Sequence, residues 1–251
     1  MAKFDLSGRT AFVTGTTSGL GRHFAKVLAA AGAGVAISGR RADRLEALAA
    51  EILDAGGRCA VVTLDVTDDA RIGSAFEAAE TLLGPIDILV NNAGMNLPGL
   101  VLDRSLDEFD AVLKTDLRAP FVLAREAGRR MIERGLGGRI INIASIGSFR
   151  VLPGLTAYCV AKAGLAMMTQ CLAREWVRYE INVNAICPGY IETELNSAWF
   201  ATEGGRKQVS TFPRRRLGKE EDLDGLLLLL ASEESRAITG ALLTVDDAQS
   251  L

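Results

Sequence analysis

Short apolar runs rich in β-branched residues alternate along this chain with longer stretches of helical periodicity. Several of these runs show little polar alternation, as strands buried on both faces of a parallel sheet do. We expect strands at residues 10–14, 34–38, 60–65, 86–91, 139–144, 182–186 and 242–245. Helices are expected at residues 20–31, 42–55, 68–83, 106–133, 157–179 and 219–231. The alternation predicts an α/β fold, a Rossmann-like doubly wound parallel sheet of about seven strands with helices on both faces.

The length of 251 residues, of which 49% are apolar, suits one large α/β domain. No linker, repeat or low-complexity stretch divides the chain, so residues 1–251 are expected to form a single nucleotide-binding domain. The least regular region spans about residues 188–217 and follows an expected strand. Ligands bind beyond the carboxyl ends of parallel strands, so we interpret this region as a substrate loop.

The charge balance argues against several classes of partner. A formal net charge of −3 gives no global basic field for nucleic acid or an anionic membrane. The start carries no apolar signal segment and no apolar run is long enough to cross a bilayer, so we expect a cytoplasmic protein. One histidine and four scattered cysteines give neither a disulfide framework nor a ligand cluster, so no metal site is expected.

A glycine-rich segment, residues 14–21, follows the first expected strand and opens the first expected helix. Gly15, Gly19 and Gly21 permit a tight turn, close approach of a pyrophosphate and close helix–strand packing. The helix N-terminus then offers N–H groups to the anion. The spacing G-x-x-x-G-x-G differs from the commoner fingerprint, and an ordinary glycine-rich turn is the alternative. The strand–loop–helix context favours a dinucleotide site.

The end of the second expected strand bears on the choice of dinucleotide. It reads Ser38-Gly39-Arg40-Arg41, with no acidic residue before Asp43. NAD sites usually carry an acidic residue there for the ribose 2′-hydroxyl, whereas a guanidinium can grip a 2′-phosphate. We therefore predict a preference for NADP(H), with Arg40 first and Arg41 second, while NAD(H) stays possible. The alternative is that both arginines form a solvated helix start.

Tyr158 and Lys162 lie four residues apart in an expected helix, and Tyr158 follows Ser145 by thirteen residues. Positions i and i+4 share a face of a helix, so the phenol and the ammonium project together. A nearby cation stabilises a phenolate electrostatically, which suits the group to proton transfer near neutral pH. Combined with a dinucleotide site, this pair predicts hydride transfer at a carbonyl or alcohol carbon.

Five elements in this order make the chain similar to the short-chain dehydrogenase/reductase family, in its single-domain form. They are Thr14-Gly15 with Gly19-Leu20-Gly21, then Asn91-Asn92-Ala93-Gly94, Ser145, Tyr158-x-x-x-Lys162, and Pro188-Gly189-Tyr190-Ile191-x-Thr193. The resemblance covers essentially the whole chain. It implies that Tyr158 exchanges a proton with the substrate oxygen and that Ser145 holds that oxygen. It also implies that Lys162 binds the nicotinamide ribose and stabilises the phenolate.

The resemblance implies further cofactor contacts in four segments. They are Gly15, Thr17, Ser18, Gly19, Leu20 and Gly21 in the glycine loop; Asp65 and Val66 near the adenine; Asn92, Ala93 and Gly94; and Pro188, Gly189, Ile191 and Thr193 around the nicotinamide. Ser18 stands where many NADP-using relatives have a basic residue, which weakens the NADP(H) prediction. The family also commonly forms dimers or tetramers through the two long helices, so we expect a homo-oligomer.

The chain departs from the family pattern at two places. Asp116 stands where the family usually has an asparagine that kinks a helix and holds a relay water. We expect Asp116 to join the catalytic group and alter the pH profile; a helix-surface carboxylate is the alternative. The usual Asp-Gly-Gly after the last strand is replaced by Asp246-Asp247-Ala248, so we expect the C-terminal tail to take a different path.

The substrate loop carries aromatic and basic residues. The aromatic residues either exclude water from the reaction or simply pack the loop. Arg206, Lys207 and residues 214–216 could meet the phosphates of a thioester carrier, although a solvated or internally balanced basic face is the alternative.

The leading interpretation is a ketoreductase acting on a 3-oxoacyl thioester or a small ketone. A sugar, polyol or ring-alcohol dehydrogenase is the runner-up. A silent dinucleotide sensor is disfavoured because Tyr158 and Lys162 are both present, and a hydrolase because no G-x-S-x-G motif occurs.

Overall fold

The computed structural model describes residues 4–194 and 196–251, and in them seven strands form one parallel sheet of order β3-β2-β1-β4-β5-β6-β7. Strands β2 and β3 are added on one side of β1. After β3 the chain crosses to the other side of β1, where β4 to β7 follow in order. The strands are β1 (Thr10–Thr14), β2 (Gly34–Gly39), β3 (Arg58–Thr63), β4 (Ile88–Asn91), β5 (Gly138–Ile143), β6 (Ile181–Pro188) and β7 (Leu242–Val245). The expected doubly wound α/β fold is confirmed.

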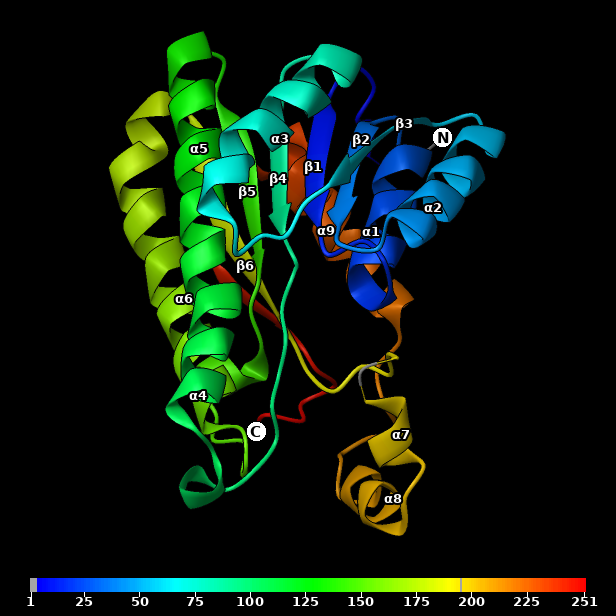
Figure 1. Ribbon diagram of the computed structural model, residues 1–251, viewed down its shortest axis with the longest axis vertical. Coiled ribbons are helices and arrows are strands. Elements are labelled where there is room, and N and C mark those ends of the chain that lie inside the picture. Colours follow the sequence, from blue (N-terminus) through cyan, green and yellow to red (C-terminus); the bar gives the residue numbers. More distant parts are fainter. Residues whose placement is uncertain (1–3, 195) are drawn as a thin grey trace.

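Helices cover both faces of the sheet, as Figure 1 shows. In the described residues they are α1 (Gly19–Ala30), α2 (Ala42–Asp54), α3 (Asp69–Leu83), α4 (Leu106–Leu113), α5 (Ala119–Arg134), α6 (Thr156–Trp176), α7 (Ser197–Phe200), α8 (Glu203–Ser210) and α9 (Asp224–Ala231). No helix in that part of the chain combines the length and the apolar character needed to cross a membrane.

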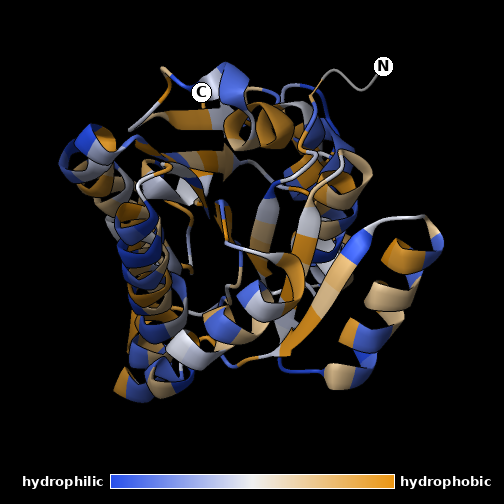
Figure 2. Ribbon diagram, turned by 90° about the horizontal axis from the view of Figure 1, so that it is seen from above, coloured by the Kyte–Doolittle hydropathy of each residue, from blue (hydrophilic) through white to orange (hydrophobic). Residues whose placement is uncertain are grey.

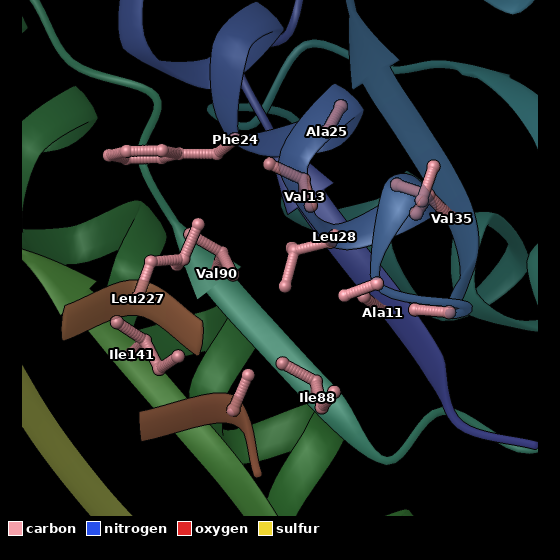
Figure 3. Packing of buried hydrophobic residues seen from close by; sticks show 14 of the residues in the cluster. Ala11, Val13, Phe24, Ala25, Leu28, Val35, Ile88, Val90, Ile141 and Leu227 are labelled. Carbon is pink, nitrogen blue, oxygen red and sulfur yellow. The ribbon is translucent and has the colours of Figure 1, made fainter. Parts of the chain in front are cut away.

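Successive side chains of each buried strand point to opposite faces and so build two cores. On β1, Ala11 and Val13 pack with α1, α2 and α9, and Figure 3 shows this core around Phe24 and Leu227. Phe12 points the other way and stacks on Phe76 of α3, with ring centroids 4.7 Å apart. Figure 2 shows hydrophobic residues along the strands and more hydrophilic ones on the outer faces of the surrounding helices.

The bounds of several elements differ by a few residues from those expected, and two segments differ in kind. The single helix expected at 106–133 is divided into α4, a π-helical turn over Lys114–Arg118, and α5. Pro120 has no N–H to donate to the carbonyl of Asp116 four residues earlier, which removes a regular α-helical bond and favours the wider turn. The expected irregular loop at 188–217 contains two short helices, α7 and α8, and Thr202 caps α8 by accepting from the Gly205 N–H at 3.1 Å.

The strands all run in one direction, so their carboxyl ends form one rim of the sheet. In Figure 1, α7, α8, the first turns of α4 and α6, and the C-terminus lie beyond that rim. The strand order reverses at β1, and open α/β sheets bind their ligands beyond the carboxyl ends of the strands at such a point. The candidate site therefore lies at this rim.

Candidate active site

Tyr158 and Lys162 project from the first two turns of α6 toward the end of β5. The Lys162 Nζ lies 5.5 Å from the centroid of the Tyr158 ring. It donates to the carbonyl of Ile143 at 3.0 Å, and only 5% of the lysine is exposed. The predicted i, i+4 pairing on one helix face is thus realised by a buried ammonium held against the end of a central strand.

Ser145 lies two residues beyond β5, in an extended conformation that places it at the rim. Its Oγ accepts from the Gly147 N–H at 3.0 Å, which leaves the hydroxyl proton free to be donated elsewhere. A Cβ added to Gly147 would lie 3.4 Å from both the Ser145 Oγ and the Tyr158 Cε1. Both hydroxyl-bearing residues therefore border the same small space above Gly147.

Asp116 reaches the same group from the π-helical turn and is fully buried. Its Oδ2 lies 3.2 Å from the Lys162 Nζ, and its Oδ1 accepts from the Met95 N–H at 2.8 Å. Burial disfavours the Lys162 ammonium, but the attractions of Asp116, Tyr158 and Cys187 together outweigh it, so the pKa of Lys162 is raised. Burial also raises the pKa of the Asp116 carboxyl, and the nearby Lys162 ammonium opposes that shift. The alternative of a helix-surface carboxylate is wrong, because the widened turn directs the Asp116 side chain inward.

A chain of buried polar side chains fixes α6 on the sheet. The Asn91 amide of β4 donates to the Asn142 Oδ1 of β5 at 2.9 Å, and the Asn142 amide donates to the Thr169 Oγ1 at 2.9 Å. Thr169 in turn donates to the Leu165 carbonyl at 2.8 Å within α6. Buried polar groups with such partners specify one arrangement of the elements that carry them. Of these hydrogen-bonded residues, only Asn91 belongs to a motif recognised in the sequence.

The glycine loop fits a dinucleotide phosphate. Gly15 and Gly19 have φ of +72° and +51°, a region that favours glycine. A Cβ on Gly21 would lie 2.3 Å from both the Asn92 Nδ2 and the Gly15 carbonyl oxygen. Ser18 begins α1 without a side-chain cap, so the N–H groups of the first turn stay available to an anion.

The residues after β4 close the opposite side of this loop. The Thr14 hydroxyl accepts from the backbone N–H groups of Asn92 and Ala93, each at 3.0 Å, and the Asn92 amide donates to the Thr14 carbonyl at 2.9 Å. A Cβ on Gly94 would lie 3.0 Å from the Asp116 Oδ2 and 3.5 Å from the Lys162 Nζ. Asn92, Ala93 and Gly94 therefore connect the glycine loop to the catalytic group. Thr14 belongs to the glycine motif, but the sequence did not predict that its hydroxyl would bind the backbone after β4.

Charged residues border the far end of the cleft, beyond β2 and β3. The Arg41 Nε donates to the Thr17 Oγ1 and its Nη2 to the Ser18 Oγ, both at 3.1 Å. The Arg40 side chain is 78% exposed and lies 3.9 Å from the Asp65 Oδ2. Hydrogen bonds from Thr67 lower the pKa of Asp65, so its carboxylate stays ionised. Arg40 was expected to be the main phosphate-binding residue, but it is Arg41 that contacts the glycine loop.

The segment after β6 forms the third side of the cleft. Pro188 ends the strand, Gly189 follows it and Ile191 is buried. Thr193 lies close to the loop, since a Cβ on Gly19 would be 3.6 Å from the Thr193 Cβ. Val66, beyond β3, is buried in the core that contains Phe76, and Leu20 packs against the core that contains Phe24.

The single histidine lies outside the catalytic group, and a buried cysteine borders it. His23 pairs with Asp224 of α9, with its Nε2 2.6 Å from the carboxylate. Cys187 is buried on β6, and burial raises the pKa of its thiol to about 11, so it is not a thiolate nucleophile. A cavity of about 650 Å³ lies between α7, α8 and residues 217–221, and none of Ser145, Tyr158 and Lys162 lines it.

The aromatic residues of the substrate loop pack on one another. Tyr190 stacks on Phe212 with centroids 5.3 Å apart and meets Phe200 edge-on at 5.8 Å. The Trp199 Nε1 donates to Gln208 at 2.9 Å. Burial is the main reason that the pKa of Tyr190 is raised, so it stays a neutral phenol. The aromatic residues form a cluster that is compatible with both expected roles.

Known proteins match the chain over nearly its whole length. A family model described as enoyl-(acyl carrier protein) reductase matches residues 15–247. The 3-oxoacyl-(acyl-carrier-protein) reductase of Aquifex aeolicus is 37% identical over 97% of this chain and 98% of its own. The gluconate 5-dehydrogenase of Gluconobacter oxydans is 34% identical over 97% of this chain and 95% of its own.

A solved structure agrees in fold as well as in sequence. The gluconate 5-dehydrogenase of Burkholderia cenocepacia, crystallised with NADP and tartrate, has a TM-score of 0.94 and 34% identity, covering 99% of this chain and 97% of that one. These matches agree with the order of motifs and with the geometry at the rim. The chain belongs to the short-chain dehydrogenase/reductase family and is an oxidoreductase that interconverts alcohols and carbonyl compounds with a nicotinamide dinucleotide.

Proposed function

We propose that this enzyme is an NADP(H)-dependent ketoreductase in which Ser145, Tyr158, Lys162 and Asp116 carry the proton chemistry. The observation that supports this most directly is the buried Lys162 ammonium, between the Tyr158 ring and the Asp116 carboxylate. The bound nicotinamide would supply or accept the hydride. The protein residues would hold the substrate oxygen and transfer one proton.

Ser145 and Tyr158 would share the substrate oxygen. The Ser145 hydroxyl, fixed by the Gly147 N–H, would donate to that oxygen and orient the carbonyl. Tyr158 would give its proton to the oxygen as hydride arrives at carbon, and would take it back in the oxidation direction. The Lys162 ammonium, charged and desolvated, would stabilise the phenolate left behind. Asp116 would keep that ammonium charged and in place.

Arg41 supports the preference for NADP(H), because its guanidinium is already held over the glycine loop by Thr17 and Ser18. Arg40, which is more exposed, would close on a 2′-phosphate from the other side of the site. The test is the ratio of kcat/KM values with NADPH and NADH. Arg40→Asp should turn this ratio toward NADH, and an unchanged ratio would reject the assignment of Arg40.

For the substrate we propose a 3-oxoacyl thioester or small ketone, in keeping with the relationship to the Aquifex aeolicus reductase. A keto sugar acid is a second candidate, favoured by the two gluconate dehydrogenase relatives. Arg150, exposed on the loop between Ser145 and α6, would serve a substrate carboxylate. The loop arginines Arg214 and Arg216 pair with Asp247, which leaves less charge for the phosphates of a carrier.

A substrate panel tests this proposal directly. Purified enzyme is mixed with NADPH and, in separate reactions, a 3-oxoacyl thioester, its small ester analogue, a cyclic diketone and keto sugar acids, and loss of the reduced-nicotinamide absorbance is followed. Turnover of the thioester and the ester, with little turnover of the sugar acids, supports the first candidate. The reverse pattern, lost in Arg150→Ala, supports the second. No consumption of NADPH with any carbonyl compound would contradict the proposed function.

The assembly proposed for this enzyme is a homodimer or homotetramer built through α5 and α6. Large apolar side chains on these helices are exposed in the single chain, namely Phe121, Val160 and Met167. Exposed apolar side chains of this size favour association when they gather on one surface. Light scattering measures the mass, and a monomer would contradict the assignment. A cytoplasmic location stays a prediction.

A further inference from the structure

The C-terminal residues contact the point where the substrate loop begins. We call residues 188–217 the lid and Asp246–Gln249 the tail turn. The Gly189 N–H donates to the Val245 carbonyl at 3.0 Å, and the Tyr190 N–H donates to the Gln249 Oε1 at 2.7 Å. A Cβ on Gly189 would lie 2.5 Å from that same Oε1. Figure 1 shows the red C-terminal segment folding back where the lid leaves β6.

The same tail turn also holds the end of the lid. The Asp247 Oδ1 lies 3.3 Å from the Arg214 Nη1, and its Oδ2 lies 2.7 Å from the Arg216 Nη2. The Asp247 side chain is only 17% exposed, so this pairing is partly shielded from water. The Gly218 N–H, just past the lid, donates to the Tyr190 carbonyl at 2.8 Å. This bond joins the beginning and the end of the lid, which we call its two roots.

Both sides of this contact have an unusual backbone. Asp247 and Ala248 have φ of +51° and +62°, and Arg215, between the two paired arginines, has φ of +49°. These values lie in the left-handed region that non-glycine residues seldom adopt. The dihedral angles argue against the expected change of path, since Asp247 and Ala248 take the region that glycine would favour. Asp247 adds a carboxylate there that glycine lacks.

We propose that Asp247 is a positioning residue that, with Gln249, fixes both roots of the lid and thereby sets its closure over the substrate carbonyl. This inference rests on the proposed role of residues 188–217 as a substrate lid. Strained residues persist where the surrounding structure holds them, and they gather at functional positions. Here the strained backbone supports an ion pair that joins the tail to the lid. A cavity of about 200 Å³ lined by Tyr190, Arg216 and Asp247 gives the roots room to shift when that pair is absent.

The experiment compares variants that separate backbone strain from the ion pair. Asp247→Gly removes both, Asp247→Asn removes the charge and keeps a residue that tolerates positive φ, and Ala248→Gly relieves strain beside an intact pair. We expect KM for the carbonyl substrate to rise about fivefold in both Asp247 variants, with kcat changed less than about twofold. Ala248→Gly should leave KM unchanged. Tm should not fall in Asp247→Gly, because glycine suits this backbone.

Limited trypsin digestion gives a readout that needs no turnover. Cleavage after Arg206 and Lys207, both exposed on α8, should be about fivefold faster in the two Asp247 variants than in wild type or Ala248→Gly. Unchanged KM and unchanged cleavage would overturn the proposal. A fall in Tm that parallels the loss of activity would also overturn it, by assigning Asp247 a merely structural role. If wild type reduces no carbonyl compound, the proposed function fails, while cleavage still tests the anchoring of the lid.

Discussion

The two ends of the cofactor cleft differ in how deeply their charged side chains are buried. At the catalytic end, Lys162 and Asp116 are buried and linked to the carbonyl of Ile143 and the N–H of Met95. At the far end, Arg40 and Arg41 are exposed and contact the half-buried Thr17, Ser18 and Asp65. Both ends carry charge, but only one end holds its charges away from water.

The difference indicates which properties each end can control. A buried charge interacts strongly with its neighbours and has few alternatives, so it suits a proton transfer that demands one geometry. An exposed guanidinium contributes less and is screened by salt, so it suits selection between two similar cofactors. We therefore expect substitutions at the catalytic end to change rates or pH dependence, and substitutions at the far end to change cofactor preference modestly.

The largest effect is expected for Tyr158→Phe. Removing the hydroxyl removes the proton donor of the proposed reaction, so kcat should fall about 10³-fold. Cofactor affinity, measured by quenching of protein fluorescence, should change less than about twofold. Tyr179→Phe, at a partly exposed tyrosine beyond α6, is the matched control and should retain activity. Full activity in Tyr158→Phe would mean that the catalytic end works in another way.

The next effect concerns the frame that joins the two ends. Gly21→Ala would place a Cβ 2.3 Å from the Gly15 carbonyl oxygen and should lower the free energy of unfolding by about 2 kcal/mol. Gly73→Ala is the matched control, because nothing lies within 4 Å of a Cβ there and alanine favours its helix by about 1 kcal/mol. Urea denaturation measures both. Equal stability of the two variants would show that the loop tolerates a wider packing than the contacts indicate.

A smaller effect, on pH dependence, is expected for Asp116→Asn. Attraction to Asp116 raises the pKa of Lys162 against the effect of burial, so the ammonium persists to higher pH. The amide removes the largest attraction that opposes burial, so the pKa of Lys162 should fall. The alkaline limb of the kcat/KM profile should then move to lower pH.

Asp110→Asn, at an exposed residue of α4, is the control for this pH experiment and should leave the profile where it is. A profile of Asp116→Asn that superimposes on the wild-type profile would remove Asp116 from the proton chemistry.

Local features of this fold could be predicted from the sequence, whereas features that depend on distant residues could not. The strands and the motif residues Gly15, Ser145 and Tyr158 were predictable, because buried periodicity and short spacings are local properties of the chain. The position of Asp116 depends on a π-helical turn beside Pro120, and helical periodicity alone does not distinguish that turn from a regular helix. The pairing of Asp247 with Arg216 joins residues distant in sequence, so only the folded chain brings it out.

The smallest effect is expected at the far end of the cleft. Arg41→Ala should lower the ratio of kcat/KM with NADPH to that with NADH by about tenfold, because its guanidinium is already placed beside Thr17 and Ser18. Arg40→Ala should lower the ratio less, about threefold, since this more exposed side chain must first be ordered to reach a phosphate. Steady-state kinetics at two salt concentrations measure both ratios, and the preference should weaken as salt rises. A larger loss in Arg40→Ala would restore the order expected from the sequence. Loss of kcat with both cofactors would instead mean that residues at the far end also shape the catalytic end.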